Sequence, residues 1–147
     1  MTLNILVPID GTPVALQAVH TAIHLARQGL KCHVLLANVQ APATFYEIIN
    51  EPNPQVLENV AEGAGQHTLA QAKALLGEAE IPHASEVVTG DPAHALLDLV
   101  DTRQIGMIVI GAHGKGWLRT ALQGSVSQTL LQDAAVPVLV VKLPAAD

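Results

Sequence analysis

Aromatic side chains are nearly absent from this chain. Only Phe45, Tyr46 and Trp117 are aromatic among 147 residues, although half of the residues are hydrophobic. The core must therefore be filled with Ala, Val, Leu and Ile, a composition that favours helices packed on an aliphatic sheet. The length is enough for one core and too short for two ordinary ones, so we expect a single domain over residues 1–147.

Cysteine and basic residues are also scarce. The single cysteine, Cys32, excludes an internal disulfide and a multi-thiolate zinc site, and it is consistent with a reducing compartment. We expect its side chain to act as a small buried hydrophobe. The chain has only 7 Lys and Arg residues, which are scattered, and a formal charge of -6. Nucleic-acid binding requires clustered Lys and Arg, so we expect no nucleic-acid partner.

Long hydrophobic runs are missing as well. No run approaches the roughly 18 apolar residues of a membrane span, and no basic region precedes an apolar stretch near Met1. The sequence therefore predicts neither export nor membrane insertion, and the cytoplasm is the default location.

What the chain does contain is a series of short, branched apolar segments, each of strand length. Several of them are continuously apolar rather than alternating, which is expected where both faces of a parallel sheet are covered. The expected strands are Leu3–Ile9, His33–Val39, about Ala84–Thr89, Met107–Ile110 and Val136–Val141.

Segments of helical period lie between these strands. In the first, Thr12 can cap the helix, Pro13 suits its first turn and Gly29 can end it. Strand and helix alternate throughout, which predicts a parallel α/β sheet with helices on both faces and right-handed crossovers. The expected helices are Val14–Gln28, about Pro54–Gly77, Pro92–Arg103 and Ser125–Asp133.

Residues 40–53 fit this alternation poorly. They contain two prolines and the only Phe and Tyr, and they follow the second expected strand. We interpret them as a surface excursion, for which a lid and a tolerated insertion are equally good explanations.

A glycine-rich stretch follows the fourth expected strand directly. Gly111, Gly114, Gly124 and Ser125 precede or open the last expected helix, where exposed backbone N–H groups favour an anion. A purely structural interpretation also fits, because Ser125-Val-Ser-Gln128 is a capping box. The Walker loop and the dinucleotide fingerprint are both excluded, since Trp117 and Leu118 follow Gly116 and Arg119 replaces the third glycine.

The full spacing, Gly-x-x-Gly, nine residues and then Gly-Ser, resembles the nucleotide-binding pattern of the universal stress protein family. The similarity extends to Ile5–Thr12, to Gly90–Ala93 and to Pro137–Val141, so it covers almost the whole chain. One departure is Ala112, which stands where the family usually has a small hydroxyl residue.

The resemblance implies an open five-stranded parallel sheet of order 3-2-1-4-5, in which the ends of strands one and four meet at a switch point. It further implies that Asp10 lies by the nucleoside, that the Val39 backbone meets the adenine and that the Gly124-Ser125 loop holds the phosphates. Asp10 also has a simpler interpretation as a turn residue. The expected nucleotide-binding residues are Pro8, Asp10, Val39, Ile110, Gly111, Gly114, Gly124, Ser125, Val126 and Ser127.

The ligand implied by the resemblance is ATP, with Mg or Mn carried by its phosphates. No nucleophile pair, paired carboxylates or metal triad is visible, so we expect no catalytic residues and slow or no hydrolysis. The expected function is a cytoplasmic regulatory or stress-survival module. There are two alternatives. One is a partner-binding member of the family that does not use ATP, and the other is a nucleotide-dependent enzyme of the same fold group.

Two further expectations concern partners and metals. The last expected strand is short, apolar and at a sheet edge, and family members commonly pair it across a two-fold axis, so we expect a homodimer through residues 136–142.

His20 and His24 share a helix face, but no carboxylate accompanies them at helical spacing, and we expect no metal site there.

Overall fold

The computed structural model describes residues 1–40, 53–112 and 125–143. Its centre is one sheet of five parallel strands in the order β3-β2-β1-β4-β5, which confirms the predicted architecture and strand order. The strands are β1 (Leu3–Pro8), β2 (Cys32–Gln40), β3 (His83–Thr89), β4 (Met107–Gly111) and β5 (Val138–Val141).

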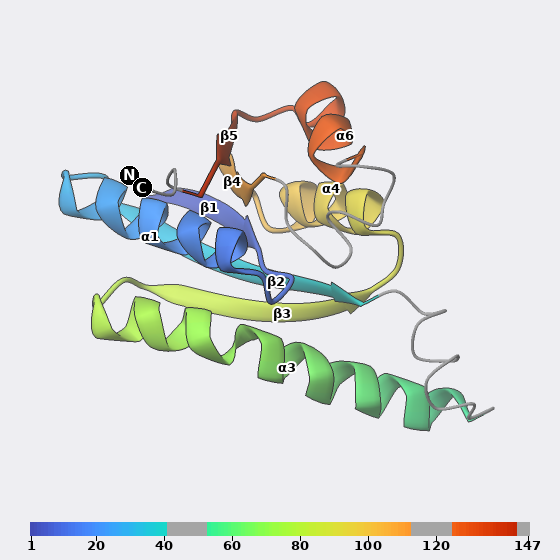
Figure 1. The fold of residues 1–147 in the computed structure, drawn as a ribbon. Helices are drawn as coiled ribbons and strands as arrows, with labels where there is room; N and C mark the ends of the chain where they lie inside the picture. Colours follow the sequence, from blue (N-terminus) through green and yellow to red (C-terminus); the bar gives the residue numbers. More distant parts are fainter. Residues whose placement is uncertain (41–52, 113–124, 144–147) are drawn as a thin grey trace.

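Helices cover both faces of the sheet. On one face α1 (Pro13–Arg27) and α3 (Pro54–Glu78) pack against the sheet, and on the other α4 (Pro92–Thr102) and α6 (Ser125–Asp133) do so (Figure 1). Each face has its own aliphatic core, built largely of Val, Leu, Ile and Ala. Cys32 is 6% exposed and belongs to the core under α1 and α3, as predicted.

Three helices begin in the same way, with a polar cap followed by proline. The caps are Thr12, Asn53 and Asp91, and the side-chain oxygen of each accepts a backbone N–H of the first turn. Proline then takes the first helical position, where its missing N–H has no intrahelical partner to lose. This local chemistry explains why the predicted helix starts agree with the structure to within one residue.

The last strand starts later than predicted. It begins at Val138 and not at Val136, with Pro137 just before it. Proline cannot donate to a ladder, although the Pro137 carbonyl still accepts from Ile108 N–H at 2.9 Å. The expected excursion at residues 40–53 falls largely on residues 41–52, outside the described part of the chain.

Candidate functional site

The turn after β1 places Asp10 at the carboxyl edge of the sheet. Asp10 Oδ1 accepts hydrogen bonds from Thr12 N at 3.1 Å and from Thr12 Oγ1 at 2.5 Å. Thr12 Oγ1 in turn accepts from Ala15 N at 3.3 Å, so the same network starts α1. Gly11, with φ of +86°, supplies the left-handed backbone of the turn. The interpretation of Asp10 as a turn residue is therefore correct for one of its two oxygens.

The second carboxylate oxygen of Asp10 has no such role. Oδ2 is buried and has no hydrogen-bond partner among the described residues. Burial raises the pKa of Asp10 above its ordinary value, and the hydrogen bonds from Thr12 oppose this shift only in part. A buried acceptor without a donor is costly, which makes Oδ2 a place where a hydroxyl or N–H of a ligand would be favoured.

Gly111 ends β4 in close contact with the start of α1. A Cβ atom built on it would lie 2.6 Å from the carbonyl oxygen of Val14 and 2.8 Å from the Val14 carbonyl carbon. These are backbone atoms that cannot move aside as a side chain could. Glycine at this position is thus required by packing, whether or not the following loop binds a ligand.

The end of β2 extends beyond its pairing with β1. The ladder between these strands ends at Pro8 and Ala37, and the Ala37 carbonyl accepts from Ile9 N–H at 2.8 Å. The N–H and C=O groups of alternate residues point to the same side of a strand. The N–H and C=O of Val39, two residues after Ala37, therefore also point to the side of β1, beyond the last residue pair of the β1–β2 ladder. The Val39 side chain is buried in the core under α4 and α6, which leaves its backbone as the part able to meet a ligand.

Asn38 is a feature of the site that sequence reasoning missed. It is 2% exposed, and its Nδ2 donates to the Ile9 carbonyl at 2.8 Å. Its Oδ1 accepts from Gln40 Nε2. The bond to Ile9 ties the end of β2 to the residue before Asp10. An amide directly after the apolar run Val34–Ala37 was the available signal, because buried polar groups need partners.

The structure brings together part of the predicted site. Pro8, Ile110 and Gly111 end neighbouring parallel strands, and Asp10 follows the first of them. Val126 and Ser127 lie in the first turn of α6, with the Val126 side chain buried. Gly114, Gly124 and the side chain of Ser125 lie outside the described residues, and so does the capping expected of Ser125. Trp117 and Arg119, which distinguish this stretch from the Walker loop and the dinucleotide fingerprint, also lie outside them.

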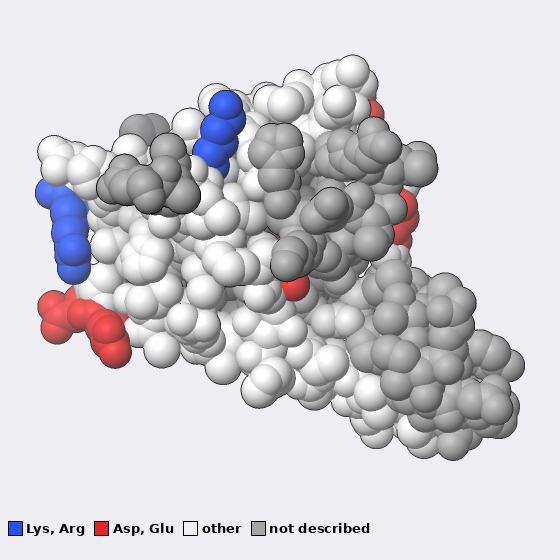
Figure 2. Space-filling view, viewed as in Figure 1, with Lys and Arg blue, Asp and Glu red and all other residues white. Residues whose placement is uncertain are grey.

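Few charged side chains lie on the face shown in Figure 2. Most described side chains there are uncharged, and a basic and an acidic group meet at its left margin. His20 and His24 are exposed on α1. Within residues 1–40, 53–112 and 125–143, no group of three His, Cys, Asp or Glu side chains is placed to hold a metal ion. No helix in these same ranges is both long and apolar enough to cross a membrane.

Comparison with known proteins connects this arrangement to a family. The model of the universal stress protein family matches residues 1–142. Universal stress protein MJ0531 of Methanocaldococcus jannaschii is 29% identical over 141 residues, which are 96% of this chain and 82% of that protein. The solved structure of the protein MJ0577 is 25% identical, covers 99% of both chains and has a TM-score of 0.79.

Three other solved universal stress proteins share the fold and contain a nucleotide. They are 16% to 24% identical to this chain, with TM-scores of 0.63 to 0.69, and cover 95% to 97% of it and 93% to 98% of their own chains. The Arabidopsis thaliana protein has AMP bound, the Archaeoglobus fulgidus protein is in complex with dAMP and the third is in complex with cAMP.

Proposed function

The chain belongs to the universal stress protein family, and from this premise we propose that the carboxyl edge of its sheet binds ATP between β1 and β4. The observation that carries the proposal is the buried, unpartnered Oδ2 of Asp10. A ribose hydroxyl is a donor of the right kind for this oxygen, and the site lies where ligands bind in open α/β sheets.

The neighbouring residues support the same ligand. The backbone of Val39 offers a donor and an acceptor beside Asp10, which suits the edge of an adenine ring. The start of α6 presents backbone N–H groups at a helix N-terminus, which favours phosphates. Mg²⁺ or Mn²⁺ would then enter with the phosphates, because the described residues provide no metal cage. The AMP, dAMP and cAMP complexes of proteins with this fold agree with an adenine nucleotide.

Regulation rather than turnover is the function that we propose for this site. Among the residues that the structure describes, Asp10 is the one carboxylate that we place at it, and its Oδ1 is already bound by Thr12. General base catalysis needs a group aimed at the water or hydroxyl to be activated, whereas in this proposal the free Oδ2 of Asp10 accepts from a ribose hydroxyl of the nucleoside. We therefore expect ATP to act as a bound signal in a cytoplasmic stress-response module, with slow or no hydrolysis.

The test is the affinity for ATP-Mg of the Asp10→Asn variant, measured by titration calorimetry. This change keeps the Oδ1 acceptor and replaces Oδ2 with a donor, so the hydroxyl loses its charged acceptor. We expect affinity to fall about 10-fold or more. Asp101→Asn, at an exposed position of α4, makes the same chemical change away from the site and should bind as the wild type does.

Two glycine variants extend the test to the phosphates. Gly114→Val and Gly124→Val should also bind ATP-Mg much more weakly, if the glycine loop holds the phosphates. Equal binding by the wild type, Asp10→Asn and both glycine variants would overturn the site. A mass spectrum of any nucleotide released on denaturation identifies the natural ligand, and a purified protein that binds no ATP would favour the partner-binding alternative.

A further inference from the structure

A hollow lies on the sheet, away from the carboxyl edge where we propose that the nucleotide binds. It opens on the face covered by α4 and α6, over the first half of β1, β2 and β3, whereas Asp10 and Gly111 lie where strands end. Its volume of about 610 Å³ is in the range of small-molecule pockets. The lining residues are Asn4, His33, Leu35, Ala84, Ser85, Glu86, Arg103 and Ile105.

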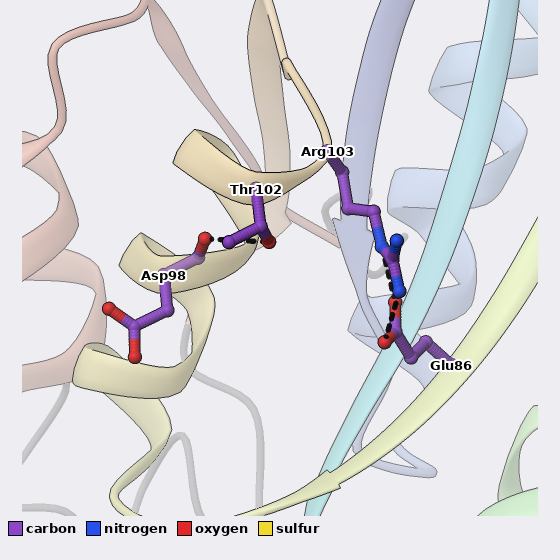
Figure 3. A network of polar contacts seen from close by, with 4 residues as sticks. All are labelled: Glu86, Asp98, Thr102 and Arg103. Carbon is purple, nitrogen blue, oxygen red and sulfur yellow. Dashed lines mark hydrogen bonds and ion pairs between the residues drawn. The ribbon is translucent and has the colours of Figure 1, made fainter.

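Arg103 spans one side of this hollow. From the end of α4 its side chain reaches Glu86 on the edge strand β3 (Figure 3), where Nη2 donates to Oε1 at 2.7 Å and Nε to Oε2 at 3.0 Å. A guanidinium has five N–H donors, and this pairing uses two. The two N–H groups of Nη1 have no partner among the described residues.

The pairing of Arg103 with Glu86 is also open to competition. The two side chains are 53% and 26% exposed, and an ion pair at such a surface contributes little to stability. A carboxylate arriving from solvent can bind one N–H of Nη1 together with the spare N–H of Nη2, or displace Glu86. A bidentate contact of this kind is the geometry that arginine offers to planar anions.

The rest of the lining suits an apolar body attached to such an anion. Leu35 and Ile105 are each 6% exposed and form an aliphatic floor, and Ala84 adds an exposed methyl group. His33 is half-buried on the same side, and its ring has no hydrogen-bond partner among the described residues. We propose that this hollow is a second ligand site, for a small organic carboxylate whose apolar part lies on Leu35 and Ile105 and whose anion binds Arg103.

The experiment uses benzoate as the probe and amide NMR shifts of the full chain as the readout. We expect the shifts to be confined to residues around the hollow, such as His33, Ala84 and Glu86. Benzyl alcohol has the same ring without the charge, and it should bind about 10-fold more weakly. The amide spectrum also reports whether each variant is folded.

Two substitutions give opposite expected signs. Arg103→Gln removes the donor and should weaken benzoate binding about 10-fold, whereas Glu86→Gln frees the guanidinium and should strengthen it several-fold. Arg27→Gln, an exposed position elsewhere, removes the same charge and should change affinity less than about two-fold. If the Arg103–Glu86 pair acted only on the fold, both of its variants would weaken binding.

The proposal is overturned if benzoate shifts residues around Asp10 and Val39 instead, if Arg103→Gln behaves as Arg27→Gln does, or if benzyl alcohol binds equally well. The hollow shares no residue with the proposed nucleotide site. A failure of ATP binding would therefore leave this result standing, and the two proposals can fail separately.

Discussion

At the scale of the single residue, Asp10 combines a structural and a functional demand. Its Oδ1 completes the turn and is held by Thr12, while its Oδ2 is buried without a partner. Burial penalises the charged form of this carboxyl in the folded protein more than in the unfolded chain. The free protein thus keeps a group that costs stability at neutral pH, which is common where a site is arranged for a ligand.

The raised pKa of Asp10 predicts the sign of a pH dependence. Because the folded state binds the Asp10 proton more tightly than the unfolded state, this group stabilises the fold fully below its unfolded pKa. That stabilisation is lost as pH rises through its folded pKa. We therefore compare the free energies of unfolding of the wild type and Asp10→Asn. The wild-type value minus the variant value should fall as pH rises from about 4 toward neutral.

Urea denaturation of both proteins without nucleotide, across this pH range, measures the difference. Asp101→Asn is the control, since it makes the same chemical change at an exposed position of α4 away from the site. If the wild-type free energy of unfolding, relative to that of Asp10→Asn, rose with pH, the fold would favour the charged form of Asp10. That result would contradict the effect expected from the burial of Oδ2.

At the scale of elements, helix starts could be predicted from the local sequence, whereas contacts between elements could not. The caps at Thr12, Asn53 and Asp91 are local, and the sequence predicts the helices they begin to within one residue. The strand order instead came from the family resemblance, because alternation alone does not order the strands. The bond from Asn38 to Ile9 and the packing of Gly111 depend on which strands and helices meet, so neither could be predicted locally.

The contact between β4 and α1 gives an element-scale prediction. Gly111→Ala would place a methyl group 2.6 Å from the Val14 carbonyl oxygen, and the end of β4 or the first turn of α1 would have to shift. Overpacking of this kind should lower the free energy of unfolding by about 2 kcal/mol or more. Urea denaturation without nucleotide measures it.

A second glycine provides the matched control with the opposite sign. Gly63 lies within α3, and a Cβ built on it meets nothing within 4 Å. Gly63→Ala should therefore raise the free energy of unfolding by about 0.5–1 kcal/mol, because alanine loses less backbone freedom in a helix. A Gly111→Ala variant as stable as the wild type would show that the glycine serves only the loop that follows it.

At the scale of the whole molecule, the two edges of the sheet are not equivalent. The edge strand β3 carries the charged residue Glu86, whereas β5 reads Val-Leu-Val-Val and has no charged residue. Charged residues on an edge oppose uncontrolled strand pairing, and their absence leaves β5 suited to a partner strand. Leu139, 39% exposed on β5, and Leu143, 54% exposed just after it, add apolar surface there.

The homodimer predicted through residues 136–142 would use the uncharged edge strand. A two-fold axis beside β5 would bring its copies together, so Leu139→Lys places two positive charges near each other and should shift the protein to monomer. Leu131→Lys makes the same change on α6, where Leu131 is 55% exposed, and should leave the dimer intact. Light scattering at micromolar concentration measures the mass, with twice the mass of one chain expected for the wild type and for Leu131→Lys. A wild-type protein with the mass of one chain would contradict the homodimer. Equal dissociation of Leu139→Lys and Leu131→Lys would mean that the contact does not lie at β5.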